Sequence, residues 1–82
     1  MRPFHSVYIL QSLSTPARHY AGSTENLQDR LRKHNAGEVP HTAKFKPWQI
    51  QNAITLRDRD RAFALEAYLK TASGRAFAIK RL

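Results

Sequence analysis

The absence of cysteine is the feature that most limits how this 82-residue chain can fold. Neither a disulfide nor a thiolate-bound zinc ion can stabilise the fold, so the packing of apolar side chains must do so. A chain of this length buries one modest core. We therefore predict a single domain over residues 1–82, and the lack of cysteine agrees with a reducing cytoplasm.

The chain is strongly basic. Its 14 Lys and Arg residues against 6 Asp and Glu residues give a formal net charge of +8. Such a surface attracts polyanions, so the predicted partner is nucleic acid, with DNA favoured over RNA. A basic surface kept for solubility and a ribosomal or membrane-surface role are the alternatives. No segment approaches the roughly 20 apolar residues of a membrane span, and the start lacks a signal-peptide pattern. We therefore expect a soluble, cytoplasmic protein that is monomeric or weakly oligomeric.

Two β-prone segments open the chain. Residues 7–10 and the segment around residues 19–21 are separated by residues 11–18, which are rich in turn formers. This pattern predicts a β-hairpin with a long loop. Antiparallel pairing would bring Tyr8 and Tyr20 to one side of the hairpin, where their phenols could contact a phosphate. The alternative is that both are core tyrosines, which are more common in strands than catalytic ones.

A basic helix is predicted next, from residue 24 to about residue 36, with Ser23 or Thr24 as its cap. Arg30 and His34 are four positions apart and so share one face of this helix. The guanidinium can grip two phosphate oxygens, and the imidazole titrates near neutrality, so the pair suits a phosphate. Alternatively, His34 simply closes the apolar stripe of a generally basic helix.

The second half of the chain predicts one strand and two helices. Residues 38–47 hold two prolines and no periodicity, which indicates a loop facing the ligand. Residues 48–56 alternate between apolar and polar side chains, which predicts a strand buried on one face, with Asn52 interrupting that face. Asp58 can cap a helix that Gly74 interrupts, and a short basic helix ends the chain. The predicted order is β-β-α-β-α-α, an α+β fold.

Glu66 stands out among the six carboxylates. It lies in the middle of a predicted helix, within the least polar stretch of the chain, residues 62–69. A carboxylate placed there is expected to be partly buried, which costs free energy unless a cation or hydrogen bonds compensate. The alternative is a surface glutamate paired with Lys70 four residues later, and this helix taken alone favours that alternative.

Other cations are expected to contact the nucleic-acid backbone. They are spread over the first helix, the following loop and the last helix, and comprise Arg32, Lys33, His41, Lys44, Lys46 and Arg75. The four histidines do not have the spacing of a zinc site. The basic surface, the two phenols, Arg30, His34 and Glu66 form a coherent set for metal-assisted phosphodiester hydrolysis.

Six segments carry a further signal: Val7-Tyr8-Ile9-Leu10, Tyr20-Ala21-Gly22-Ser23-Thr24, Asn26-Leu27-x-x-Arg30-Leu31-x-x-His34-Asn35, Lys46-Pro47-Trp48, Leu65-Glu66-x-Tyr68-Leu69-Lys70 and Ser73-Gly74-Arg75-Ala76-Phe77. In order and spacing they resemble the signature of GIY-YIG nuclease domains, most closely the short stand-alone bacterial members. Ala21 stands where isoleucine is usual. No asparagine follows Asn52, so Ser73 or Lys70 would replace an asparagine that some larger members place near the phosphate.

This resemblance implies a three-stranded antiparallel sheet flanked by helices. It also implies that Tyr8 and Tyr20 face the scissile phosphate and that one of them positions or deprotonates the attacking water. Arg30 would stabilise charge on the pentavalent phosphate, and His34 would be the helix histidine of the family. Glu66 would bind a single metal ion, Mg²⁺ or Mn²⁺.

The function implied is that of a metal-dependent endonuclease with low intrinsic sequence specificity, acting in DNA repair or recombination. Specificity could come from a protein partner, since phosphate contacts carry no sequence information. The principal alternative is a nucleic-acid-binding module that keeps the fold but cleaves weakly or not at all. A basic structural protein of a ribonucleoprotein is a more distant alternative.

Overall fold

The computed structural model describes residues 4–82, so the first three residues of the predicted domain lie outside the described part. Its elements are β1 (His5–Ser12), β2 (His19–Thr24), α1 (Leu27–Asn35), α2 (Pro40–Ala43), β3 (Trp48–Leu56), α3 (Arg59–Leu69) and α4 (Ala72–Arg81). The predicted α+β class and the order of the predicted elements are confirmed. None of the helices in residues 4–82 is long and apolar enough to cross a bilayer.

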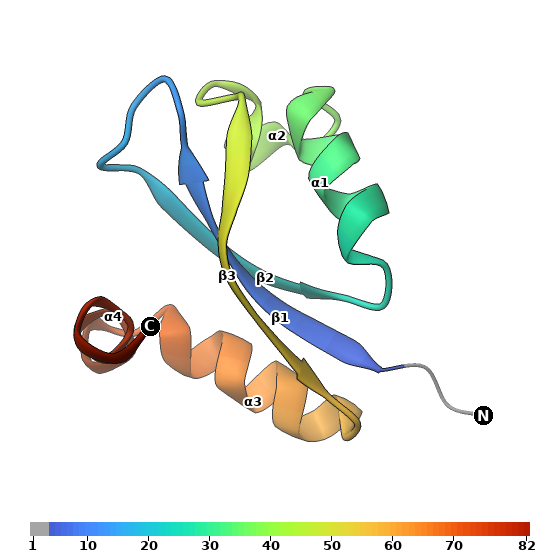
Figure 1. The fold of residues 1–82 in the computed structure, drawn as a ribbon, viewed down its shortest axis with the longest axis vertical. Helices are drawn as coiled ribbons and strands as arrows, with labels where there is room; N and C mark the ends of the chain where they lie inside the picture. The colour runs from blue at the N-terminus through green and yellow to red at the C-terminus, as the bar shows by residue number, and fades with distance from the viewer. Residues whose placement is uncertain (1–3) are drawn as a thin grey trace.

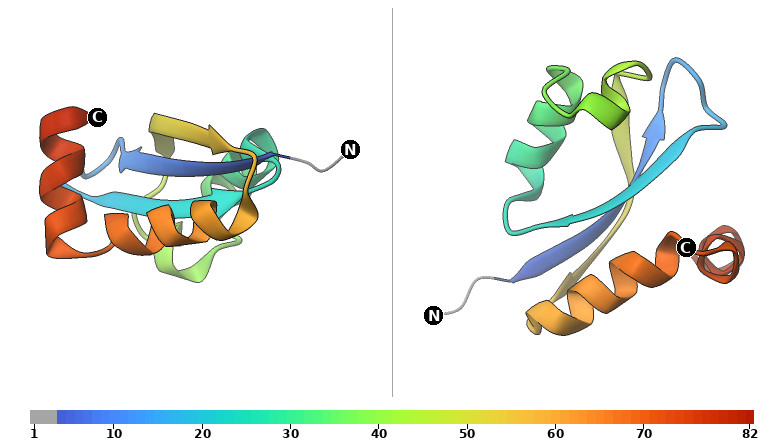
Figure 2. Two further views of the ribbon diagram at one scale, coloured as in Figure 1. Left: turned by 90° about the horizontal axis from the view of Figure 1, so that it is seen from below. Right: turned by 180° about the vertical axis from the view of Figure 1, so that it is seen from behind.

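The three strands form an antiparallel sheet in the order β2-β1-β3, which confirms the sheet implied by the resemblance. The first strand is therefore central. Figure 1 shows α1 and α2 on one side of this twisted sheet and α3 and α4 on the other. Figure 2 shows the sheet from behind, with β2 at its outer edge, and from below, with α4 lying across the end of α3.

Both faces of β1 are buried, because helices cover the sheet on both sides. Alternate residues of the strand therefore enter two separate cores. Val7 and Ile9 pack with α3 in one core, whereas Tyr8 and Leu10 pack with Trp48 in the other. A residue of β1 is thus assigned to one side of the sheet by its position alone.

A bulge in β3 corrects the prediction of a strand with one buried face. Ile9 pairs with Asn52 and Leu10 pairs with Ile50, so Gln51 is an extra residue in the ladder. One extra residue moves every later side chain to the opposite face. The even-numbered residues before the bulge consequently face α1, whereas those after it face α3.

The first helix begins later than predicted. The second strand stays paired with β1 as far as Thr24, so Ser23 and Thr24 are extended and neither caps the helix. Asn26 is the cap instead, and its side chain accepts a hydrogen bond of 3.0 Å from the backbone N–H of Asp29. Pairing of β2 with β1 therefore moves the start of the helix past the two predicted caps.

The segment predicted to be a loop contains the short helix α2. Pro40 occupies its first turn, where the missing N–H of proline costs no hydrogen bond. Thr42 is buried, and the Trp48 indole N–H donates to its carbonyl oxygen at 2.9 Å. These contacts hold the segment against the sheet beside α1.

The break between α3 and α4 falls at Thr71 and not at Gly74 as predicted. Asp58 caps α3 as expected, whereas Thr71 caps α4 and accepts from the Gly74 N–H at 3.0 Å. Gly74 is buried inside α4, where a Cβ atom would collide with the carbonyl group of Tyr68. Glycine is therefore needed for close approach of two helices, not for ending one.

Candidate active site

The hairpin register places both phenols on the α1 side of the sheet. Tyr20 pairs with Leu10, and Tyr8 pairs with Gly22, so all four positions share one face. The two tyrosine rings are 6.5 Å apart between centroids. A Cβ atom at Gly22 would lie 2.5 Å from the Tyr8 hydroxyl oxygen, so this glycine leaves the space that the Tyr8 ring occupies.

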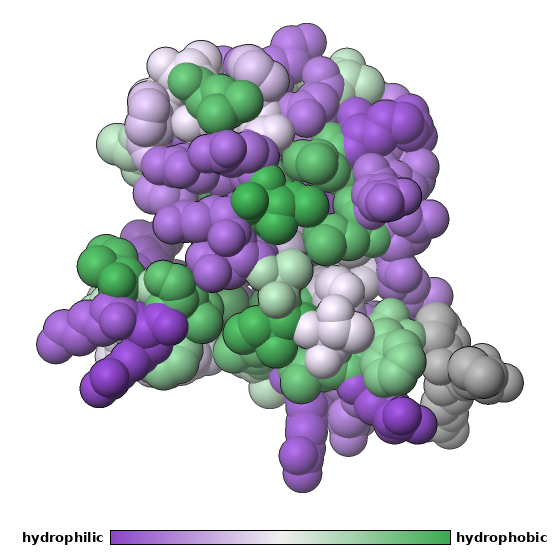
Figure 3. All heavy atoms as spheres, viewed as in Figure 1, coloured by the Kyte–Doolittle hydropathy of each residue, from purple (hydrophilic) through white to green (hydrophobic). Residues whose placement is uncertain are grey.

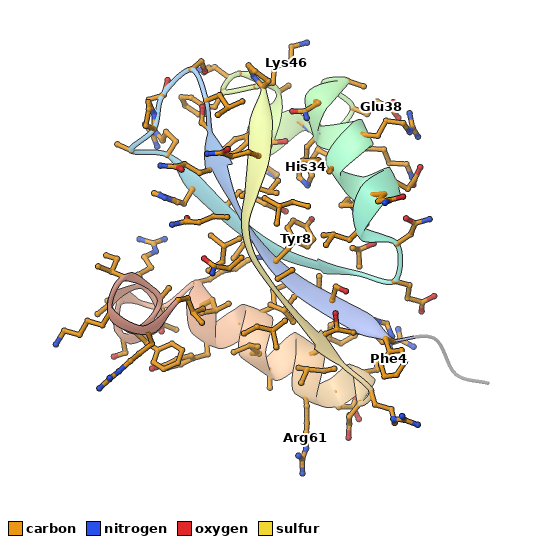
Figure 4. The ribbon with its side chains drawn as sticks, in the orientation of Figure 1. Phe4, Tyr8, His34, Glu38, Lys46 and Arg61 are labelled. Atoms are coloured by element: carbon orange, nitrogen blue, oxygen red, sulfur yellow. The ribbon has the colours of Figure 1, made fainter. Side chains whose placement is uncertain are left out.

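A buried chain of hydrogen bonds runs from Tyr8 through His34 into α2. The Tyr8 hydroxyl lies 3.1 Å from His34 Nε2, and His34 Nδ1 lies 2.7 Å from the Thr42 hydroxyl. Thr42 donates its own proton to the Val39 carbonyl oxygen at 3.2 Å, so it accepts from the Nδ1–H of His34. His34 Nε2 must then accept the Tyr8 proton, which fixes the tautomer. Figure 4 shows Tyr8 and His34 between the sheet and α1.

Burial sets the protonation states of this pair. Tyr8 is only 2% exposed, and burial raises its pKa to about 12; Tyr20 and Glu66 add to the rise, and the Arg30 charge opposes it. Burial and the Arg30 charge lower the pKa of His34 below its ordinary value. At neutral pH the phenol is therefore protonated and the imidazole is neutral.

The lowered pKa of His34 makes the folded domain sensitive to pH. Its folded pKa lies below the ordinary value of 6.5, so the unfolded chain binds more protons once the pH falls below 6.5. We expect the free energy of unfolding to be constant above that value and to decrease below it, by at most about 1.4 kcal/mol per pH unit. The measurement is urea unfolding at several pH values.

His34→Gln is the matched variant for this measurement, because glutamine can still hydrogen-bond but does not titrate. Its unfolding free energy should change less between pH 7 and pH 5 than that of the wild type. Equal slopes in the two proteins would contradict the assignment of a neutral, buried His34. Glu66, whose pKa is also lowered, contributes in a separate window below its ordinary value of 4.5.

Arg30 lies half-buried on α1, one turn before His34. Its charge lowers the pKa of Tyr8, His34 and Glu66 alike, so the guanidinium lies close enough to act on all three. Within residues 4–82 no carboxylate lies within ion-pair distance of Arg30. The guanidinium is therefore available to an anionic ligand.

Glu66 lies on α3, on the other side of the sheet, and contacts the edge strand β2 through Ser23. Its side chain is 23% exposed, with Oε1 accepting from the Ser23 hydroxyl at 2.5 Å and Oε2 paired with Lys70 Nζ at 2.9 Å. Burial opposes its ionisation, but the two hydrogen bonds and the charges of Lys70 and Arg30 outweigh that and lower the pKa of Glu66. Both alternatives considered for this residue thus hold in part, because it is partly buried and also paired.

A metal ion fits this carboxylate only with help from the substrate. No group of three or more His, Asp or Glu side chains in residues 4–82 could hold a metal ion. Mg²⁺ is commonly bound through one or two carboxylates plus waters and phosphate oxygens. Glu66 is ionised and partly exposed, so it suits a site of this kind. Lys70 would have to release Glu66 Oε2 before that oxygen could bind the metal ion.

The expected phosphate-contacting cations are not all equally available. Arg32 pairs with Asp29 at 2.9 Å and with Glu38 at 3.6 Å, and Lys33 pairs with Asp29 at 3.3 Å. The three residues of this set around α2 are exposed, namely His41, Lys44 and Lys46. Arg75 lies on α4, on the opposite side of the sheet from α1.

Sequence reasoning missed two residues of the site. Thr42 fixes the His34 tautomer, but no local pattern connects a threonine to a histidine eight positions earlier. Ser23 holds Glu66 across 43 positions, and it lies within the second signature segment, where it was considered only as a helix cap. The β2 register explains why Ser23 faces α3. Ser23 pairs with Val7, and Val7 lies on the α3 side of the sheet.

The fold and this site define a small α+β domain with a cluster of aromatic and ionisable side chains beside its edge strand. Tyr8, Tyr20 and His34 contact one another, Arg30 lies one turn before His34 on α1, and Glu66 is hydrogen-bonded to Ser23 of the edge strand β2. The chain belongs to the GIY-YIG family, since residues 4–80 match the GIY-YIG catalytic domain. The resemblance stated from the six sequence segments is thereby confirmed.

Three similar curated proteins are fungal, and each is named structure-specific endonuclease subunit SLX1. The identity is 43% over 53 residues to the Debaryomyces hansenii protein, 43% over 54 residues to that of Yarrowia lipolytica, and 40% over 53 residues to that of Mycosarcoma maydis. These matches cover 57%, 58% and 60% of this chain, and 15%, 19% and 8% of the relatives. The chain therefore spans less than a fifth of the length of these relatives.

Proposed function

We propose that this domain is a metal-dependent endonuclease that hydrolyses phosphodiester bonds in DNA. The observation that carries the proposal is the cluster of Tyr8, Tyr20 and His34. Arg30 lies one turn before His34 on α1, and Glu66 of α3 is hydrogen-bonded to Ser23 of the neighbouring edge strand β2. A cation beside an ionised carboxylate and two phenols suits an in-line displacement at phosphorus. His34, joined to Tyr8 by a hydrogen bond, supplies a neutral base.

The hydrogen-bond chain suggests how the attacking water loses its proton. A phenol with a pKa of about 12 is not ionised at neutral pH, so it cannot act as a preformed base. The water proton can pass to the Tyr8 oxygen while the Tyr8 proton passes to His34 Nε2. The new hydroxide oxygen bonds to phosphorus as the bond to the leaving oxygen breaks. Tyr20, which is less buried than Tyr8, would orient the water.

Two residues would meet the charge that develops on the phosphate. Arg30 would donate to its oxygens, more strongly as negative charge accumulates in the transition state. Glu66 would hold one Mg²⁺ or Mn²⁺ ion, which when bound supplies charge stabilisation to the phosphate and the leaving oxygen. Ser23 would orient the Glu66 carboxylate for this purpose.

The substrate we propose is branched or otherwise structured DNA, in repair or recombination. Support comes from the names of the fungal relatives, which are structure-specific endonuclease subunits. The excess of cations favours contacts to the phosphate backbone, which give low sequence specificity. The word subunit in those names supports a protein partner that supplies further specificity. A cytoplasmic location and a monomeric or weakly oligomeric state complete the proposal.

The test is cleavage of a panel of end-labelled nucleic acids by the purified chain. The panel contains duplex, single-stranded and branched DNA with matched RNA, each with Mg²⁺, Mn²⁺ or a chelator. We expect cleavage of branched DNA with either ion and none with the chelator. Cleavage in the chelator would remove the metal from the proposal, and cleavage of RNA alone would remove DNA as the substrate.

A nucleic-acid-binding module with this fold is the second candidate. The ion pair of 2.9 Å between Lys70 and Glu66 favours it, because the ammonium group neutralises the carboxylate without a metal ion. Such a module would bind members of the same panel with strong salt dependence and cleave none of them.

A further inference from the structure

A groove of about 660 Å³ lies on the α3 side of the sheet, between the β1–β2 hairpin and α4. Ile9, Ala21 and Asn52 come from the sheet, and Arg75 and Ile79 come from α4. In Figure 3 the outline of the molecule is indented on the left, between α4 below and the hairpin above, at the place where Figure 1 shows these two segments facing each other.

This groove is continuous with the candidate active site. Tyr20 and Lys70 line it, and both also belong to the active-site cluster. Lys70 pairs with Glu66, and its ammonium group lies 5.7 Å from the centroid of the Tyr20 ring. A polynucleotide whose scissile phosphate lies between Arg30 and Glu66 could therefore pass directly into the groove.

The side chains of the groove suit a polynucleotide. Arg18, His19 and Arg75 line it together with Lys70, and no Asp or Glu is among its lining residues within the described part of the chain. Cations without carboxylates favour phosphates. The amide side chains of Gln51 and Asn52 offer donors and acceptors to base edges.

The size of the groove favours a single strand over a duplex as its ligand. Pockets of about 300–1,000 Å³ enclose a ligand of drug size, which is the scale of one or two nucleotides. A duplex is far wider, because its major groove alone measures about 12 Å across. The hairpin and α4 bound the groove on two sides, and its volume is on the scale of nucleotides and not of stacked base pairs.

We propose that this groove binds a single-stranded segment of DNA that leaves the active site next to the scissile phosphate. That this segment lies next to the scissile phosphate rests on the proposed function. The single-stranded segment is the part of a branched substrate that the groove contacts. Arg75 binds a phosphate of this segment, and Ile79 packs against a base at the rim.

The experiment is fluorescence anisotropy with the whole chain in the presence of a chelator, so that no probe is cleaved. The probes are a blunt DNA duplex and the same duplex with a single-stranded arm of about ten nucleotides, within the site sizes of single-strand-binding folds. We expect Arg75→Ala to weaken binding of the armed duplex by about tenfold and to lower its salt slope by about 1. Binding of the blunt duplex should be unchanged.

Arg81→Ala is the matched control, because Arg81 is on the same helix but does not line the groove. It should change the affinity for both duplexes equally and by less than about twofold. Arg18 is a less suitable target, since its guanidinium stacks on the Phe45 ring at 4.7 Å and its loss would alter packing. An equal loss for both duplexes with Arg75→Ala, or no loss with the armed one, would overturn the proposal.

Ile79 gives a second test that does not depend on folding, because it is 84% exposed. Ile79→Glu should weaken binding of the armed duplex relative to Ile79→Gln, which has the same shape without the charge. Equal affinities for these two variants would also overturn the proposal. Because binding is measured without cleavage, an inactive domain that passes both tests would contradict only the proposed function.

Discussion

Replacing Glu66 with glutamine is expected to lower the cleavage rate by about 1,000-fold or more, the equivalent of several kcal/mol of transition-state stabilisation. A neutral amide keeps the shape of the side chain but loses the charge that would hold the metal ion. Binding of DNA should be unchanged or tighter, because a negative charge is removed from a basic surface. The measurements are single-turnover cleavage with Mg²⁺ and anisotropy with a chelator.

Thermal stability should decrease slightly in Glu66→Gln. The folded state favours the ionised carboxylate through Ser23 and Lys70, so the charge contributes stability at neutral pH. Lys70 is half-exposed, and such helix pairs contribute about 0.3–0.5 kcal/mol. Glu38→Gln is the control, since Figure 4 shows Glu38 at the far end of α1 from Tyr8. An active Glu66→Gln protein would remove the metal site from the proposed function and leave the binding module.

Arg30→Ala should lower the cleavage rate by about 100- to 1,000-fold while weakening DNA binding only a few-fold. The Arg30 charge acts on Tyr8, His34 and Glu66, the residues around which charge would develop during the reaction. An interaction that strengthens in the transition state affects the rate more than the ground-state affinity. The two quantities are measured on the same branched DNA, as single-turnover rate and dissociation constant.

Arg32→Ala serves as the comparison for Arg30→Ala. Arg32 is on the same helix but is 61% exposed and paired with Asp29 and Glu38, so its loss should affect binding and rate equally and weakly. Arg30→Lys should recover part of the rate, since it restores the charge without the two-pronged geometry. Equal losses of rate and affinity in Arg30→Ala would make Arg30 one phosphate contact among many.

The sequence by itself determined the order of the elements, the family and the part of the site that the hairpin and α1 contribute. The sequence predicts the hairpin that brings Tyr8 and Tyr20 to one side, and the register of that hairpin sets the face that they share. Helical spacing is enough to place Arg30 and His34 together. These relations are local, so a pattern within one element or one hairpin contains them.

Only the tertiary structure decided which partner each of these side chains meets. Thr42 orients His34 because Trp48 holds α2 against the sheet, and Ser23 meets Glu66 because α3 packs on the other side of β2. The bulge at Gln51 reversed the face of half a strand, since burial depends on the ladder with β1 and not on alternation alone. Contacts between residues far apart in sequence depend on how the elements pack, and periodicity within an element carries no information about its neighbours.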